Sequence, residues 1–532
     1  MGILSLLCFV AQVVSAQAPQ MIADIVPGPS SSWPMRPTLL NGSILFMAST
    51  PQTGRELWRT DGTIEGTELV KDIWPGPMPS SAYALTVVNG VLYFAAEDSL
   101  HGYELWKSDG TEAGTTMIKD INPVTNNGIY PGRITGLDGI VYFRTSDLVT
   151  GEELWRTDGT EVGAWLVKDI NPGPASSSVS HLIAMNGQLL FWAEDTSNGW
   201  ALWRSDGSTD GTYVVKDIDI GNTPSVLQAF YEIEGIAYFY ASDTINGGEL
   251  WRTDGTENGT WMVKDINPGP DDSWIAEMRV LNDVVIFSAL SPDVGRELWV
   301  SDGTEEGTSM IIDLNPGQGN GPFPLFNPVA LNEWLYFVGQ DESAGIVIGI
   351  YRTDGINTQL VSDSIRGISS LHVACDGIFF EGGDGLSGWE LWRVNSAGTG
   401  IYQVADINPG EYSSYPSDLT SVEDRLYFSA GTNLYGTELW YYQCSFVQIE
   451  DRTAPTMLSI SPVPTADLVR VLLPYDGQNW DITISDAVGR IVHLQDHTGR
   501  ILLLDASNWD TGSYMVLARN GKHSLWGRIV RD

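Results

Sequence analysis

Histidines are the first candidates for acid–base or metal chemistry, because an imidazole can exchange a proton or bind a metal near neutral pH. The sequence has six, namely His101, His181, His372, His493, His497 and His523. Only His493 and His497 have the four-residue spacing of a helical zinc motif. Their segment reads as a strand followed by a turn, where the two rings need not share a face. No catalytic, cofactor-binding or metal-ligating residue is therefore assigned.

Carboxylates are the second candidates, and there are 67 of them. With so many, a pair spaced like that of a glycosidase would be found by chance, so abundance alone indicates no activity. No Gly-x-Ser-x-Gly elbow or phosphate-binding loop of the Walker type is present. No Asp-x-Asp-x-Asp-Gly run is present either, so a calcium site would have to be assembled from several loops. The alternative is a solvated acidic surface; no cofactor is predicted, and calcium remains open.

Tryptophans outside the repeated motif form the third group. Trp33, Trp200, Trp274 and Trp389 lie in or beside segments expected to be loops. Their rings could serve as platforms for sugar rings. The alternative is that they are ordinary surface aromatics, which are common when they occur singly.

The charge of the chain restricts its partners. With 28 Lys and Arg against 67 Asp and Glu, the formal net charge of the 532 residues is -39. Such a surface repels phosphate backbones and anionic lipids, so nucleic acid and acidic membranes are not expected as partners. Because 42% of the residues are hydrophobic and 20 are Trp, the chain is nevertheless expected to fold around a core.

A repeat of about 48 residues supplies the elements that would position these groups. Glu-Leu-Trp or a close variant ends at Trp58, Trp106, Trp155, Trp203, Trp251, Trp299, Tyr351, Trp392 and Trp440. An Asp-Gly turn follows in seven of the nine units, and then an Asp-Ile or Asp-Leu pair commonly followed by x-Pro-Gly. Periods of this length indicate propellers, arrays or solenoids.

One unit can be divided into four short strands. Ala84–Val88 and Val91–Ala95 flank Asn89-Gly90, a strong hairpin signal, and Tyr103–Lys107 and Thr116–Ile121 flank the Asp109–Gly114 turn. Four antiparallel strands per unit are typical of a propeller blade, and Leu and Trp at adjacent positions can both be buried because a blade packs on both faces.

The phase of the repeat predicts how the ends meet. Met21–Gly28 matches a fourth strand without the three before it, and the last unit stops after its third strand at Trp440. Pairing of the two would complete a closed all-β propeller of about nine blades and remove the exposed sheet edge. An open solenoid is the competing architecture.

These repeats resemble the bacterial family named for its ELW-x-x-DGT motif. Glu56–Thr63, Glu153–Thr160 and Glu249–Thr256 match it directly as ELWRTDGT. The resemblance implies an exported, often multidomain protein, and it implies no catalytic assignment. Units seven and eight depart from the motif, with Tyr351 in place of Trp and Asn395 where Asp would begin the turn.

The first residues are interpreted as a secretory signal peptide, Met1–Ala16. The apolar run Ile3–Val14 is too short to span a membrane, and Val14-Ser15-Ala16 resembles a cleavage site. Cys8 follows Leu7 and so does not fit a lipoprotein acceptor. No later segment is apolar enough for a transmembrane helix. Cys375 and Cys444 would remain after cleavage, either as a disulfide or as two buried thiols.

After the propeller, predicted at residues 17–444, residues 445–457 are interpreted as a linker and residues 458–532 as a small β-sandwich. Six strand-like runs are expected there, at Leu468–Leu473, Trp480–Ser485, Ile491–Leu494, Ile501–Leu504, Tyr514–Ala518 and Ser524–Val530. The segment resembles the C-terminal sorting domain of the type IX secretion system of Bacteroidetes. The matching motifs are Ser461–Pro464, Ile484–Arg490, Gly512–Val516 and Gly527–Arg531.

That resemblance implies export through the periplasm, contact with the type IX machinery, and release or attachment at the cell surface. The sequence therefore favours an exported binding or adhesion module with a glycan or protein ligand. A secreted carbohydrate-active or other hydrolytic propeller enzyme, with carboxylates lining a central channel, is the alternative.

Overall fold

The structure is a computed structural model of the 532-residue chain. It describes residues 18–123, 132–218, 229–316, 328–341, 345–395 and 397–444, and, in the C-terminal part, 456–457, 459–461, 468–472, 479–486, 490–498, 501–506, 509, 512–519 and 524–531. The chain divides into two compact units, Met1–Ser445 and Phe446–Asp532. The predicted signal peptide, Cys8 and His523 lie outside the described residues.

Nine four-stranded antiparallel sheets make up the described part of the first unit. The first three are β2 (Met35–Leu40), β3 (Ser43–Thr50), β4 (Gly54–Thr60), β5 (Glu68–Lys71); β6 (Tyr83–Val88), β7 (Val91–Asp98), β8 (Gly102–Ser108), β9 (Thr116–Met117); and β10 (Gly132–Leu137), β11 (Ile140–Asp147), β12 (Gly151–Thr157), β13 (Trp165–Lys168). The fourth to sixth are β14 (Ser180–Met185), β15 (Gln188–Asp195), β16 (Gly199–Ser205), β17 (Tyr213–Lys216); β18 (Tyr231–Ile233), β19 (Ile236–Asp243), β20 (Gly247–Thr253), β21 (Trp261–Lys264); and β22 (Ala276–Leu281), β23 (Val284–Ser291), β24 (Gly295–Ser301), β25 (Ser309–Ile312). The last three are β26 (Val329–Leu331), β27 (Trp334–Asp341), β28 (Ile346–Thr353), β29 (Thr358–Ser362); β30 (His372–Ala374), β31 (Gly377–Gly383), β32 (Trp389–Val394), β33 (Ile401–Ala405); and β34 (Ser417–Val422), β35 (Arg425–Thr432), β36 (Gly436–Gln443) with β1 (Gln20–Met21).

The strands agree closely with the sequence prediction. Asn89 and Gly90 form the hairpin between β6 and β7, and both have positive φ, as that turn requires. The predicted fourth strand Thr116–Ile121 is shorter in the structure: β9 spans Thr116–Met117, and beyond it the Ile118 amide donates to the Leu105 carbonyl of β8 at 2.9 Å. The degenerate seventh and eighth units still form complete four-stranded sheets.

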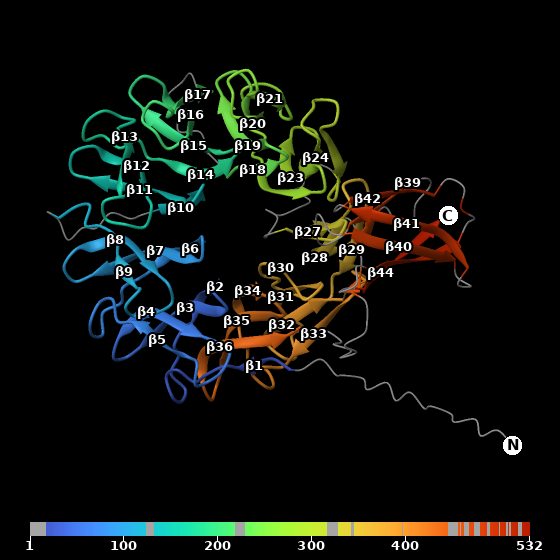
Figure 1. Ribbon diagram of the computed structural model, residues 1–532, viewed down its shortest axis with the longest axis horizontal. Coiled ribbons are helices and arrows are strands. Elements are labelled where there is room, and N and C mark those ends of the chain that lie inside the picture. Colours follow the sequence, from blue (N-terminus) through green and yellow to red (C-terminus); the bar gives the residue numbers. More distant parts are fainter. Residues whose placement is uncertain are drawn as a thin grey trace. The chain divides into compact units, whose positions relative to one another are not determined.

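The first strand of the chain pairs with the last repeat unit, as the repeat phase predicts. Met21 lies opposite Trp440 on β36, and the Ile22 amide donates to the Leu439 carbonyl at 2.9 Å. The sheets follow one another around a common centre, with the first strand of each nearest that centre (Figure 1). β34 of the ninth sheet contacts β2 of the first.

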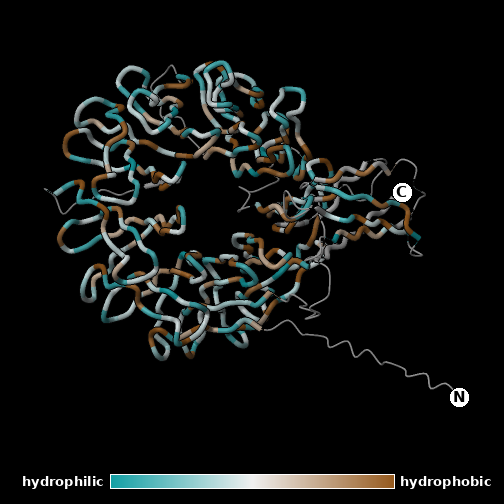
Figure 2. Tube along the Cα trace, viewed as in Figure 1, coloured by the Kyte–Doolittle hydropathy of each residue, from teal (hydrophilic) through white to brown (hydrophobic). Residues whose placement is uncertain are grey.

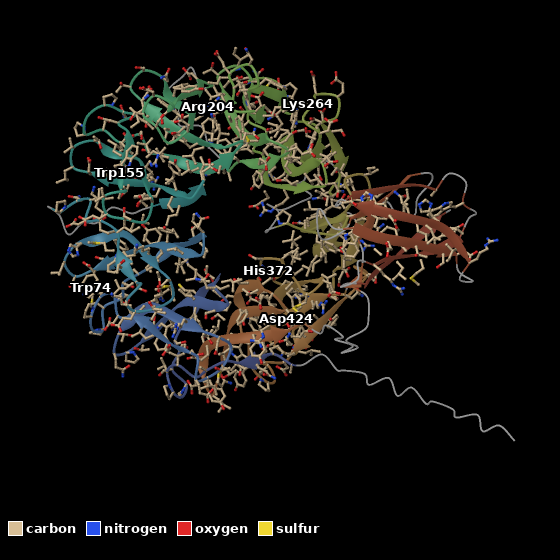
Figure 3. The ribbon with its side chains drawn as sticks, in the orientation of Figure 1. Trp74, Trp155, Arg204, Lys264, His372 and Asp424 are labelled. Atoms are coloured by element: carbon tan, nitrogen blue, oxygen red, sulfur yellow. A yellow bond between two sulfur atoms is a disulfide. The ribbon has the colours of Figure 1, made fainter. Side chains whose placement is uncertain are left out.

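A separate hydrophobic cluster fills the space between each sheet and the next. There are nine such clusters among the described residues, including one that joins Ile22, Phe46 and Leu439 across the first and ninth sheets. Hydrophobic stretches on the strands alternate with hydrophilic loops along the trace (Figure 2). The repeated Leu is buried throughout, and most repeated Trp rings are buried too, such as Trp155 at 7% exposure (Figure 3).

The C-terminal unit consists of two sheets around one core. β37 (Thr456–Met457), β44 (Ser524–Arg531), β43 (Gly512–Arg519), β40 (Asn479–Asp486) and β41 (Ile491–Thr498) form the first sheet, and β38 (Ser459–Ser461), β39 (Leu468–Leu472) and β42 (Ile501–Asp505) form the second. Trp480, Ile484 and Val516 are fully buried in the shared core. All six predicted strands are present. Thr456–Met457, expected to be linker, instead pairs in parallel with β44.

Candidate functional site

Two kinds of connection lie at opposite ends of the strands in each propeller sheet. We call the end with the Asp-Gly turns and the hairpins between first and second strands the turn face; in the second sheet it comprises Asn89-Gly90 and Asp109–Gly114. We call the other end the Pro-Gly face; it carries the loops that lead from one sheet to the next, such as residues 72–82, and the hairpins between second and third strands, such as residues 99–101.

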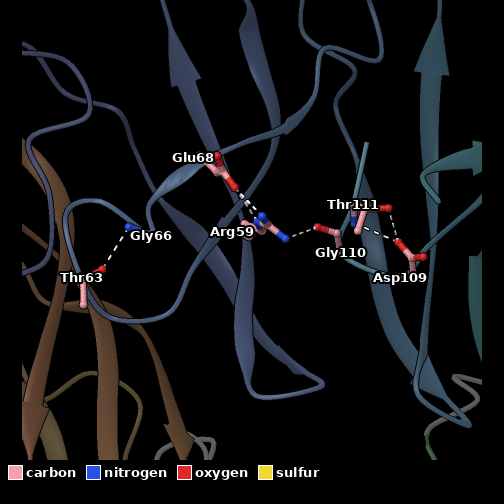
Figure 4. Close-up of polar contacts among 7 residues, drawn as sticks. All are labelled: Arg59, Thr63, Gly66, Glu68, Asp109, Gly110 and Thr111. Carbon is pink, nitrogen blue, oxygen red and sulfur yellow. Dashed lines mark hydrogen bonds and ion pairs between the residues drawn. The ribbon is translucent and has the colours of Figure 1, made fainter. Parts of the chain in front are cut away.

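The Asp-Gly turns of the turn face are hydrogen-bonded within themselves. Asp61 Oδ1 accepts from the Thr63 amide at 2.9 Å and the Thr63 hydroxyl at 2.7 Å. Thr63 Oγ1 in turn accepts from the Gly66 amide at 3.0 Å (Figure 4). Asp109 repeats this pattern with Thr111. These bonds lower the pKa of both carboxyl groups. The turn aspartates are therefore occupied in stabilising their own hairpin turns.

Cations on the turn face connect neighbouring sheets. Arg59 forms an ion pair with Glu68 and donates from Nη1 to the Gly110 carbonyl of the next sheet at 3.1 Å (Figure 4). Equivalent arginine contacts join Arg156 to Gly207, Arg204 to Gly255 and Arg252 to Gly303. Lysines of the fourth strands act in the same way, and Lys264 Nζ donates to the Thr308 carbonyl at 2.8 Å (Figure 3).

Buried glutamates of the third strands organise the Pro-Gly face. The set comprises Glu56, Glu104, Glu153, Glu249, Glu297, Glu390 and Glu438, all 0% exposed. Glu249 is representative: its carboxylate accepts from the amides of Ile266 at 2.9 Å and Asn267 at 3.3 Å, which lie in the loop to the next sheet. Each glutamate therefore holds a connecting loop against its own sheet.

Burial raises the pKa of these carboxyl groups, because removal from water disfavours the charged form. The pKa of Glu249 rises to about 7 and that of Glu104 to about 8, against an ordinary value of 4.5. These glutamates were not among the candidate residues predicted from the sequence, although their signal is present there: Glu precedes Leu-Trp in seven of nine units. Ala201 and Gly349 replace it in the other two.

Three exposed aromatic residues occupy the same position in the connecting loops of the Pro-Gly face. Trp33, Trp274 and Tyr415 are 57%, 48% and 62% exposed. Their φ angles are 50°, 46° and 47°, a left-handed conformation that bulky side chains rarely adopt. Ser81 and Ser178 have the same conformation at the equivalent position, so the fold does not require an aromatic ring there.

Cavities accompany these aromatic residues. One of about 520 Å³ is lined by Trp33 and Tyr415, a second of about 520 Å³ by Trp389 and Tyr415, and a third of about 530 Å³ by Trp274. Such volumes are in the range of small-molecule sites. Polar side chains and aromatic rings in one cavity can bind a polyhydroxylated ligand by hydrogen bonding and stacking.

The predicted loop tryptophans therefore separate into two kinds. Trp33, Trp274 and Trp389 line cavities, whereas Trp200 packs, partly buried, against the core between the fourth and fifth sheets. Tyr415 was missed. Its signal was the local pattern Ser-Ser-aromatic-Pro, which occurs at Ser31–Pro34 and again at Ser413–Pro416.

The described histidines do not meet in one site. His101 contacts Asp98 in a hairpin turn, and His372 Nε2 lies 3.0 Å from the Ser421 hydroxyl of the next sheet (Figure 3). His493 and His497 lie on one strand, β41, rather than across a strand and a turn. They share a face, but four residues of strand separate them by about 13 Å, too far to bind one ion. Among the described residues, no three His, Cys, Asp or Glu side chains are grouped to hold a metal.

Two of the three cysteines, Cys375 and Cys444, are joined. Cys375, in the hairpin between β30 and β31, forms a disulfide with Cys444 after β36, and their Cα atoms are 5.1 Å apart. Of the two alternatives left open by the sequence, the structure has the disulfide. It ties the eighth sheet to the end of the ninth at the turn face.

The C-terminal unit carries the decisive similarity to a known family. Residues 459–531 match the family described as the secretion system C-terminal sorting domain. The C-terminal unit is a type IX sorting domain. A sorting domain of this kind indicates a protein exported to the cell surface or secreted, and contact with the type IX machinery.

Solved structures resemble the chain more distantly. PorZ, an essential surface component of the type IX secretion system of Porphyromonas gingivalis, is 12% identical, with a TM-score of 0.33, over 93% of this chain and 74% of PorZ. A puromycin-hydrolyzing peptidase of Mycobacterium tuberculosis is 10% identical, with a TM-score of 0.36, over 63% of this chain and 55% of the peptidase. The β-propeller domain of the Trilobed protease from Pyrococcus furiosus is 11% identical, with a TM-score of 0.30, over 63% of this chain and 98% of that domain.

No curated protein is significantly similar in sequence. The part of the chain that the structure describes contains no helix with the length and hydropathy needed to cross a membrane.

Proposed function

We propose that this protein is an exported, closed β-propeller of nine blades that binds an extracellular glycan or protein through its Pro-Gly face. Met1–Ala16 acts as the signal peptide, the repeats belong to the ELW-x-x-DGT type, and the sorting domain directs passage across the outer membrane. Closure is supported by the pairing of β1 with β36 and by the number of inter-sheet clusters. Nine sheets in an open row would have eight such clusters, whereas a closed ring has nine.

The observation that carries the binding function is the set of exposed aromatic residues in left-handed backbone. A ring at Trp33, Trp274 or Tyr415 buries little apolar surface, and its backbone conformation is costly for a bulky residue. Serine suffices at the equivalent positions of two other sheets. Selection for a ligand explains why rings stand there, since aromatic residues dominate recognition surfaces.

A hydrolytic function is the second candidate, and one observation favours it. Glu381 and Asp418 both line the cavity that also contains Trp33. Burial raises the pKa of Glu381, as a general acid would require. Two carboxyl groups of different environment in one cavity could cleave a glycosidic bond.

The experiment is a glycan array together with binding to isolated cell envelopes, followed by turnover assays on the same sugars. The triple variant Trp33→Ala, Trp274→Ala, Tyr415→Ala should lose binding while it is still secreted. The control is Leu434→Ala, which removes an exposed apolar side chain that lines none of the cavities described above. Retained binding in the triple variant would refute the role of the Pro-Gly face, and measurable cleavage would overturn a purely binding function.

The export route has its own test. Deletion of residues 458–532 should leave the propeller in the periplasm, because the type IX machinery would no longer be contacted. Arrival of the truncated protein at the cell surface would refute this step.

A further inference from the structure

The cavity lined by Trp33 and Tyr415, together with Glu381, Asp418 and Asn433, lies where the eighth and ninth sheets meet the first. We call it the seam cavity. We propose that the seam cavity is a binding site for a neutral oligosaccharide. The inference rests on the proposed function, of which it names the site and the ligand class.

Two aromatic platforms are held in place before any ligand arrives. The Trp33 amide donates to the Thr437 carbonyl at 3.3 Å, and the Tyr415 amide donates to the Trp389 carbonyl at 3.2 Å. Each ring precedes a buried proline, Pro34 or Pro416, whose fixed φ further restricts the loop. The backbone beneath each ring is therefore ordered before binding, so only the rotamer freedom of the ring itself is lost when it stacks on the apolar face of a sugar.

The polar side chains around the platforms suit hydroxyl groups. Asp418 and Asn433 are exposed at the rim, whereas Glu381 is partly buried. Carboxylate and amide oxygens accept from sugar hydroxyls, and an Asn amide also donates. The lining contains Glu381 and Asp418 but no Lys, Arg or His. A uronate or other acidic sugar would bring like charges together, so the site selects neutral sugars.

A neighbouring cavity extends the site beyond one sugar ring. It shares Ser413 and Tyr415 with the seam cavity and adds Trp389, one cation, Arg366, and one carboxylate, Glu411. Carboxylates therefore still outnumber cations across the two linings, and the preference for neutral sugars holds for both. Tyr415 lines both cavities, whereas Trp33 lines only the seam cavity and Trp389 only its neighbour, so the three rings span two adjacent cavities. A ligand of several residues can contact all three, whereas a monosaccharide reaches one or two.

The test uses the full secreted chain and hexasaccharides of glucose, mannose and xylose, with hexagalacturonate as the acidic comparison. Binding is measured by calorimetry and by Trp fluorescence. At least one neutral hexasaccharide should bind at least tenfold more tightly than hexagalacturonate and than its own monosaccharide. Trp33→Ala and Tyr415→Ala should each weaken binding at least tenfold, and Tyr415→Phe, which keeps the ring, should bind within about threefold of the parent chain.

Trp165→Ala is the matched control, because Trp165 is also an exposed tryptophan but lines none of the three cavities. It should leave the affinity within about twofold, and thermal midpoints of all variants report whether they are folded. Loss of binding in Trp165→Ala as large as that in Trp33→Ala would overturn the seam cavity as the site. Preference for hexagalacturonate, or no neutral ligand at all, would also overturn the inference, whereas the proposed function is judged separately on the array and the cell envelopes.

Discussion

The two faces of the propeller-like unit use their polar residues in opposite ways. On the turn face, Asp61 and its equivalents bond the backbone of their own turn, and Arg59 and its equivalents bond the next sheet. On the Pro-Gly face, the buried glutamates fix the loops from below, while Trp33 and Tyr415 remain exposed beside a cavity.

In this chain, the residues that recur from one repeat unit to the next serve to hold the fold together. Most recurring residues already form hydrogen bonds or pack in the core. Examples are the turn Asp, the third-strand Glu and the Leu-Trp pair. Residues that break the repeat at a repeated backbone position are free to contact something else. The candidate site therefore lies in loops whose backbone conformation recurs from sheet to sheet, at positions where the residue type differs between sheets.

The largest effect is expected from Glu249→Ala, which removes support from the Pro-Gly face. The change leaves the Ile266 and Asn267 amides without their acceptor. Two buried unsatisfied donors and a lost contact should cost about 4 kcal/mol of unfolding free energy. Urea unfolding followed by Trp fluorescence measures it, with the exposed Glu257→Ala of the same sheet as control. Equal midpoints for the two variants would contradict the structural role of the glutamates.

The second-largest loss of unfolding free energy is expected from removal of the disulfide, which lies on the turn face. The bond spans a sequence separation of 69 residues, and the double variant Cys375→Ser, Cys444→Ser should lose about 2 to 4 kcal/mol through greater freedom of the unfolded chain. Thermal melting with and without reductant measures it. Reductant should lower the midpoint of the parent chain and leave that of the double variant unchanged; sensitivity of both would contradict this disulfide as the cause.

The buried glutamates also predict a pH dependence. The pKa of Glu249 is 4.5 in ordinary surroundings and about 7 in the fold, so between these pH values the folded chain holds a proton that the unfolded chain has released. Stability should therefore fall as pH rises through this window, by about 1.4 kcal/mol per pH unit for each such group. Below the window both states are protonated, and above it the loss is complete. The glutamine of Glu249→Gln cannot ionise, so in this variant the unfolding free energy should depend less on pH, by the contribution of one carboxyl group. An unchanged pH dependence would contradict the raised pKa of Glu249.

The smallest effects come from a matched pair that compares the faces directly. Asp254→Ala removes the acceptor of the Thr256 amide and hydroxyl on the turn face and should cost about 1 kcal/mol. Trp274→Gly, on the Pro-Gly face, should leave stability unchanged or raise it by up to about 1 kcal/mol, because glycine accepts positive φ. Urea midpoints of the two variants decide it. Destabilisation by Trp274→Gly as large as that by Asp254→Ala would mean that the ring supports the fold instead of a ligand.

Much of the architecture could be predicted because short-range signals repeat nine times. Asn89-Gly90 and the Asp109–Gly114 turn specify hairpins from local backbone preferences alone, and the alternating strands between them follow. The six strands of the sorting domain were predicted for the same reason. The prediction was wrong at Thr456–Met457, because a two-residue strand has no periodicity and forms only by pairing with distant β44.

Four features follow from local pattern and can be predicted from the amino-acid sequence: the repeat, the strands of each sheet, the complementary phase of the first and last units, and the similarity of the C-terminal unit to a sorting domain. Only the tertiary structure decided that the third-strand glutamates are buried, that Cys375 and Cys444 meet, and that Trp33 and Tyr415 line one cavity although 382 positions separate them in the chain. Burial and proximity depend on which sheets lie side by side, and no local spacing encodes that.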